Sequence, residues 1–169
     1  MKGFHYAGSQ IAIHWLSAAL VIFLLLTGTL VMANLPNTTE KISNITIHML
    51  IGSCVGLLVV LRVILWRSRP QPEPIKGQLI IKIGHLALNV VLLLLVLSGV
   101  FLSLQSNTFE AVFGNGTLPA DFHAFIPRKV HGILSRIAMF LIALHVLAAL
   151  YHQYLLKDGL LSRMIPSKE

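Results

Sequence analysis

The feature that most constrains this chain is a set of four long apolar segments. Each holds about 20 residues with almost no charge, the length that crosses the hydrocarbon core of a bilayer as a helix. Because lipid offers no partners to unpaired backbone groups, each segment is predicted to be a helix. The predicted helices cover residues 11–34, 45–66, 82–104 and 129–156. The sequence therefore predicts an all-α integral membrane protein, a four-helix bundle forming one domain over residues 1–169.

Composition argues against the main alternatives to this fold. Of the 169 residues, 56% are hydrophobic and 11% are charged, whereas soluble domains average about 25% charged residues. A soluble fold of this size could not bury so much apolar surface. The net charge is +7, but the basic residues lie between the apolar segments, which favours a lipid bilayer surface over nucleic acid. The single cysteine, Cys54, excludes an intrachain disulfide and a Cys-x-x-Cys-His haem attachment.

The basic residues also predict the orientation, because cytoplasmic loops carry an excess of lysine and arginine. One face holds Lys2, Arg62, Arg67, Arg69, Lys76, Lys82, Lys157, Arg163 and Lys168. The opposite face holds Lys41, Arg128, Lys129 and Arg136. We therefore expect both termini in the cytoplasm. The first apolar segment is too long for a signal-peptide core, so it is expected to be retained as the first helix.

Histidines carry the chemistry of this sequence, because ionisable side chains inside a membrane are rare and mark function. His131 and His145 are 14 residues apart on the fourth helix, which is about 21 Å along its axis and nearly the same face. His48 begins the second helix at the depth of His131, and His14 begins the first helix near the depth of His145. The spacing predicts an outer pair, His48 with His131, and an inner pair, His14 with His145.

Two stacked histidine pairs are what two six-coordinate haem groups held between helices need. Small residues follow the proposed ligands, and they either admit a flat macrocycle or pack the helices together. They are Gly52, Ser53, Gly56, Gly132, Ser135, Ala148 and Ala149. Arg62 lies 14 residues after His48, hence on the same face and about 21 Å deeper. It is predicted to bind the propionates of the inner haem, or else to extend toward the inner headgroups.

The inner end leaves alternatives open. His152 shares a face with His145 and is a second candidate ligand. Counted along the helix from His131, His145 falls inside the hydrocarbon and His152 at or beyond its inner edge, which favours His145 as the ligand. His85 and His152, with Lys82, then remain near the inner interface. There they either hydrogen-bond a quinone and supply its protons or are ordinary interfacial residues. A metal-ion transporter lined by the same histidines, without redox function, is an alternative of another class, but the carboxylates and cysteines that such carriers use are scarce here.

Six motifs, in their order and spacing, resemble those of a known family, the prokaryotic cytochrome b561 family. They are IAIHWL around His14, IHMLIG around His48, GHL around His85, VH at His131, LH with a later HxY from His145, and KDGLLSRMIP from Lys157. The resemblance covers nearly the whole chain. It implies a bacterial inner-membrane protein with two non-covalent haem b groups and reactivity toward quinones.

The resemblance also implies an activity, the oxidation of superoxide to dioxygen with ubiquinone taking the electrons. A related group, the cytochrome b subunits of hydrogenases and formate dehydrogenases, implies the alternative of relaying electrons between a partner dehydrogenase or hydrogenase and quinone. Basic residues beside the proposed outer haem either draw in a small anion such as superoxide or anchor helix ends to headgroups. They are Lys41, Arg128, Lys129 and Arg136.

Overall fold

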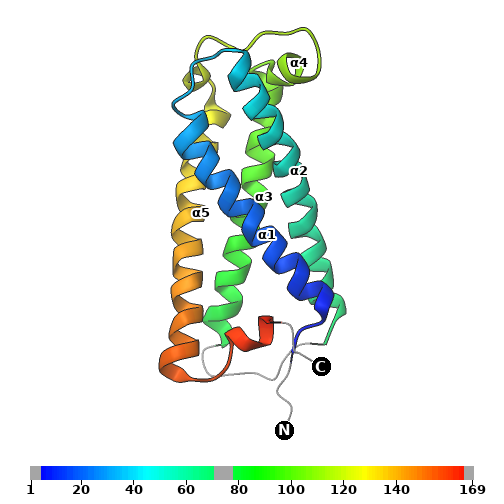
Figure 1. The fold of residues 1–169 in the computed structure, drawn as a ribbon, viewed down its shortest axis with the longest axis vertical. Helices are drawn as coiled ribbons and strands as arrows, with labels where there is room; N and C mark the ends of the chain where they lie inside the picture. Colours follow the sequence, from blue (N-terminus) through cyan, green and yellow to red (C-terminus); the bar gives the residue numbers. More distant parts are fainter. Residues whose placement is uncertain (1–4, 71–77, 166–169) are drawn as a thin grey trace.

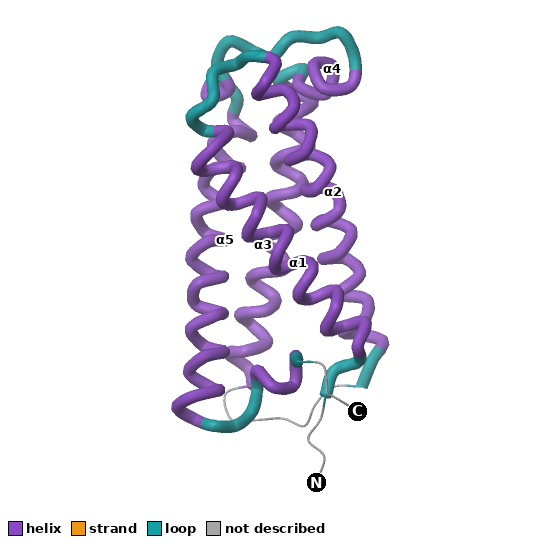
Figure 2. The backbone as a smooth tube through the Cα atoms, viewed as in Figure 1, coloured by secondary structure: helices purple, strands orange, loops and turns teal. Residues whose placement is uncertain are grey.

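Four long helices form the molecule in the computed structural model, which describes residues 5–70 and 78–165 (Figures 1 and 2). They are α1 (Gly8–Leu26), continued by the π-helix η1 (Thr27–Met32), then α2 (Thr39–Ser68), α3 (Gln78–Gln105) and α5 (Ile126–Tyr151), continued by the π-helix η3 (His152–Leu156). No strand occurs in these ranges. The predicted all-α fold with four membrane-crossing helices is confirmed.

The helices begin earlier than the apolar segments predict. Residues that precede each apolar segment form its first turn, as at α2, where Thr38 is the N-cap residue and Glu40 lies in the first turn. A carboxylate there interacts favourably with the positive end of the helix dipole. All four helices are long and apolar enough to cross a membrane. Large apolar side chains face outward, among them Leu57 and Ile80, which are 73% and 76% exposed. This surface suits lipid rather than water.

A small apolar core holds the bundle together at its middle. It contains Val21 of α1, Val55 and Val59 of α2 and Leu92 of α3. α1 packs along α2, α2 along α3, and α3 along α5. A Cβ atom at Gly56 would lie 3.2 Å from Val96 Cγ1, so glycine permits the close approach of α2 to α3.

The predicted outer end carries more structure than the sequence indicates. The connection after α3 contains α4 (Thr108–Phe113) and a short 3-10 turn, η2 (Phe122–Ala124). The chain turns tightly after α4, and the absence of a side chain at Gly116 permits this turn. A Cβ atom there would lie only 2.9 Å from the Ala111 nitrogen. Asn37 Nδ2 donates hydrogen bonds to the carbonyls of Pro119 and Ala120, at 2.7 and 3.0 Å. These bonds join the two connections of this end.

The opposite end is closed by the last described segment. After η3 the chain turns at Lys157, which has a left-handed φ of 55°, and a short 3-10 helix, η4 (Leu161–Met164), folds back beneath the bundle (Figure 1). Trp15 Nε1 donates to the Met164 carbonyl at 2.8 Å, and the Tyr6 amide donates to the Arg163 carbonyl at 3.3 Å. Both ends of the described chain therefore meet at this end. The predicted sidedness of Lys2, Lys76 and Lys168 concerns residues outside the described ranges.

Candidate functional site

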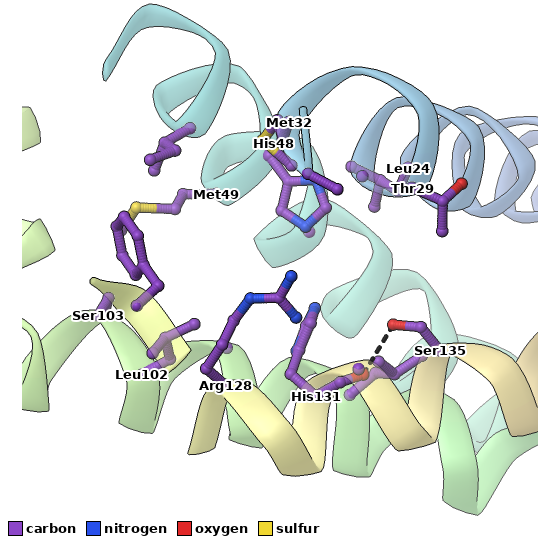
Figure 3. Close-up of a pocket in the computed structure, with 18 of the residues that line it drawn as sticks. Leu24, Thr29, Met32, His48, Met49, Leu102, Ser103, Arg128, His131 and Ser135 are labelled. Atoms are coloured by element: carbon purple, nitrogen blue, oxygen red, sulfur yellow. Dashed lines mark hydrogen bonds between the residues drawn. The ribbon is translucent and has the colours of Figure 1, made fainter. Parts of the chain in front are cut away.

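Two histidines from different helices face each other near the predicted outer end. His48 on α2 and His131 on α5 point toward one another, with ring centroids 6.2 Å apart (Figure 3). Both lie in the wall of a cavity of about 650 Å³. Arg128, one turn before His131, extends its guanidinium group into the same space (Figure 3). The structure thus brings together the outer pair that helix spacing predicted.

Two glycines shape the space around this pair. A Cβ atom at Gly28 would lie 3.6 Å from His48 Cε1, and one at Gly99 would lie 3.5 Å from His131 Cε1. Each imidazole therefore rests on a helix surface that carries no side chain at that point. Gly28 belongs to η1, and such single π-helical turns occur frequently at functional sites. An added Cβ atom at either glycine would be at ordinary contact distance from the ring, so η1 and α3 leave open space beside the two imidazoles.

Hydrogen bonding differs between the two rings. His131 Nδ1 bonds Ser98 Oγ at 2.9 Å, whereas His48 Nδ1 is buried and has no partner. Ser135 Oγ donates to the backbone carbonyl of His131 at 2.7 Å (Figure 3). The ring and the backbone of His131 are thus each held by a serine.

Three histidines meet near the opposite end. The ring centroids of His14 on α1 and His145 on α5 are 6.3 Å apart. His85 on α3 lies closer to His145, at 5.1 Å. Arg62 of α2 interacts electrostatically with all three rings. Among the described residues no carboxylate forms an ion pair with Arg62. An arginine that is partly buried in a bundle without a carboxylate is suited to an anionic group of a ligand.

The geometry of both pairs fits a metal held between two imidazoles. Metal–nitrogen bonds of about 2 Å on each side place the ring centres about 6 Å apart. The separations of 6.2 Å and 6.3 Å agree with this value, whereas the 5.1 Å between His85 and His145 is shorter. A cavity of about 650 Å³ lies within the range of cofactor sites. The separations of both pairs therefore fit an iron, and the cavity fits a haem group at the outer end.

The remaining inner candidates have different partners. His152 Nδ1 lies 2.6 Å from Asp158 Oδ2, while His85 contacts His145. Lys82 is exposed on the first turns of α3. Desolvation would raise the pKa of the Asp158 carboxyl, but the hydrogen bond with His152 and that from the Leu160 amide outweigh it and lower this pKa. The structure therefore places His85 in the inner histidine cluster and His152 in a separate pair with Asp158.

Three of the four basic residues of the outer end line the cavity. Lys41, Arg128 and Arg136 contribute to the cavity wall, and Lys129 is exposed. Lys41 Nζ donates to the Leu35 carbonyl at 2.8 Å and lies 5.5 Å from the Phe122 ring centroid. The wall also includes Asp121 and His123. The charged side chains of the cavity wall are thus predominantly but not uniformly basic.

Sequence reasoning missed several residues of the outer site. Gly28, Ser98, Gly99 and His123 were not singled out, although a serine–glycine pair inside a long leucine and valine segment is a visible signal. Of the predicted small residues, Gly52, Ser53, Gly132 and Ser135 line the cavity, whereas Gly56 packs on Val96. Small residues here thus line the cavity at four positions and pack two helices together at one.

A membrane-crossing helical bundle with facing histidines suited to haem defines a class, the transmembrane cytochromes b. A family model described as prokaryotic cytochrome b561 matches residues 5–167. The chain is 28% identical to a protein named "Probable superoxide oxidase CybB" of Yersinia pestis, over 96% of this chain and 97% of that one. It is 30% identical to "Cytochrome b561 homolog 2" of Escherichia coli K12, over 95% and 90%.

The chain belongs to the prokaryotic cytochrome b561 family. It is accordingly a multi-pass bacterial membrane protein of electron transfer, and the family implies that it binds haem b. The metal-ion transporter alternative does not agree with this membership.

Proposed function

We propose that this protein holds two haem b groups and oxidises superoxide at its outer end while reducing ubiquinone at its inner end. The observation that carries the proposal is the two facing histidine pairs, His48 with His131 and His14 with His145, at separations that fit an iron. When bound, the haem groups would supply one-electron carriers near each membrane surface. The bacterial inner membrane, with both termini in the cytoplasm and one domain over residues 1–169, is the proposed setting.

Arginines on both sides are proposed to hold the haem propionates. Arg62 lies beside the inner histidines, and Arg128 extends into the outer cavity beside His48 and His131 (Figure 3). Guanidinium groups bind carboxylates through paired, charge-assisted hydrogen bonds. Arg128 thus gains a proposed role as a haem-binding residue in addition to steering.

The outer cavity mouth is the proposed entry for superoxide. Lys41, Arg128 and Arg136 line it, with exposed Lys129 nearby, and Asp121 offsets part of their charge. A basic mouth raises association rates of small anions by roughly 10 to 1000-fold, and the effect falls with ionic strength. The name of the Yersinia pestis relative supports the choice of superoxide as substrate.

The inner end is the proposed quinone side. Two superoxide anions each lose one electron and become dioxygen, and one ubiquinone takes both electrons together with two protons and becomes ubiquinol. His85, Lys82 and His152 are the proposed residues that bind the quinone and supply protons. His152 is supported in this role by Asp158, whose side chain is 28% exposed and links the imidazole to water.

The test mixes purified, quinone-loaded protein with superoxide in a stopped-flow instrument and follows haem absorbance at several salt concentrations. Reduction should outpace unaided dismutation and slow as salt rises. If superoxide does not reduce the haem faster than it dismutates, superoxide oxidation is wrong. The alternative, a cytochrome b subunit that relays electrons from a partner dehydrogenase or hydrogenase, would then take its place, and copurification with such a partner would support it.

A further inference from the structure

We propose that Ser98 is a positioning residue for the outer haem: it holds the Nδ1 proton of His131, so that Nε2 is left to bind iron. This inference rests on the proposed function, in which His131 is an outer ligand. Ser98 lies on α3 and is 7% exposed, and it reaches across to the ring on α5. None of the six motifs that suggested the family contains Ser98.

The direction of the hydrogen bonds follows from the two neighbours of the Ser98 hydroxyl. Ser98 Oγ lies 2.8 Å from the Leu95 carbonyl oxygen and 2.9 Å from His131 Nδ1. The carbonyl has no proton, so the hydroxyl must donate to it, and the hydroxyl has only one proton. Its lone pairs are left for His131, and the Leu95 carbonyl also accepts a hydrogen bond from this ring, so Nδ1 must carry a proton. A neutral imidazole protonated at Nδ1 has its lone pair at Nε2, the state that a metal requires.

Gly99 also lies beside the His131 ring. A Cβ atom there would lie 3.5 Å from His131 Cε1 and 3.7 Å from Nδ1. The side of the imidazole that faces Gly99 therefore has room for a Cβ atom, and its edge is bonded to Ser98. The hydrogen bond selects the tautomer of the ring.

The other proposed ligands do not share this arrangement. The Nδ1 atoms of His14 and His48 are both buried without a partner. A hydrogen bond at Nδ1 raises the basicity of a metal-bound imidazole, and losing such a partner typically weakens metal affinity by about 10 to 100-fold. A more basic ligand favours ferric iron over ferrous iron. Ser98 should therefore lower the midpoint potential of the outer haem and leave the inner haem unaffected.

The test compares Ser98→Ala with Ser103→Ala in the purified, haem-loaded protein. Ser103 is a matched control, because it lies on the same helix, is also 7% exposed, and donates to the Val100 carbonyl at 2.9 Å without touching a histidine. Redox titration of Ser98→Ala should show one haem with a raised midpoint potential and the other unchanged. The electron paramagnetic resonance signal of the shifted haem should change as well, because the imidazole can rotate. Ser103→Ala should match the wild type.

Ser98→Thr keeps the hydroxyl and should restore wild-type potentials. If Ser98→Ala retains only one haem, the Thr variant must retain both for the proposal to stand. Equal potentials and spectra in Ser98→Ala and Ser103→Ala would overturn it, as would equal shifts of both haems. A His131→Ala variant that keeps both haems would instead overturn the ligand assignment of the proposed function, so the two failures are distinguishable.

Discussion

The two ends of the bundle hold their histidines in different ways. At the outer end two rings face each other across a defined cavity, each resting on a glycine, and His131 is fixed by Ser98. At the inner end three rings, those of His14, His85 and His145, gather around one another beside Arg62. The outer site offers one pair of imidazoles, whereas the inner site offers His145 two possible partner rings.

This difference separates one defined pair of rings from a cluster of three. At the outer end a hydrogen bond fixes His131, and Arg128 extends into the same cavity. The inner rings share their surroundings with Arg62, which has no carboxylate partner among the described residues. An anionic ligand group is the natural complement of either cation, so charge acts at both ends and the number of rings distinguishes them. Four predictions test this comparison.

The largest effect is expected from His48→Ala. Removing one of two facing ligands should abolish the outer haem and leave the inner one, so that haem per chain falls to about half, because each site depends on its own ligand pair. Pyridine haemochrome analysis measures this. His123→Ala, which changes a histidine in the same cavity wall that is not a proposed ligand, is the control and should keep the wild-type haem content. Full haem content in His48→Ala would overturn the outer assignment.

The inner end should show which ring binds iron. His145→Ala should lose about half of the haem, since the separation of 6.3 Å from His14 fits a shared metal. His85→Ala should keep both haem groups, because the 5.1 Å separation from His145 is too short for that arrangement. Its expected defect is slower quinone reduction after the haem groups have been reduced. The reverse result, with His85 required for haem and His145 dispensable, would make His85 the ligand.

The role of Gly99 beside the His131 ring can be tested with side chains of different size. Gly99→Leu should displace the His131 ring and weaken haem binding at the outer site, because overpacking costs about 1–3 kcal/mol. Gly99→Ala should be tolerated, since its Cβ would be at ordinary contact distance from the ring. Gly84→Leu on the same helix, where a Cβ meets nothing within 4 Å, is the control. Similar haem retention in Gly99→Leu and Gly84→Leu would show that the close contact does not orient His131.

The smallest effect concerns Asp158 at the inner end. Its pKa is lowered in the folded protein, so its contribution to stability exists above the ordinary carboxyl pKa and is lost as pH falls through the folded value. An exposed pair of this kind contributes about 0.5 kcal/mol. Asp158→Asn should therefore lower thermal stability in detergent slightly at neutral pH and match the wild type in acid. A difference that persists unchanged in acid would assign the effect to something other than this pair.

The sequence predicted the four helices and the histidine pairs because both depend on regular spacing. Fourteen residues along an uninterrupted helix bring His131 and His145 to one face, and α5 is continuous over this stretch. The contact of His85 with His145 was not predictable, because helical periodicity does not determine how α3 is rotated against α5. Ser98 was missed for the same reason, since its partner lies 33 residues away on another helix. The short helix α4 was not predictable either, because turn-forming residues dominate the sequence of the connection in which it lies.

The most direct test of the central claim is the ratio of haem to protein in the purified wild-type chain, measured with its electron paramagnetic resonance spectrum. Two facing histidine pairs predict two non-covalent haem b groups per chain, both low-spin in the ferric state because each iron has two imidazole ligands. A ratio of one would leave one histidine pair without a haem. A high-spin signal from intact protein would mean that an iron lacks its second histidine, and either result would contradict the account.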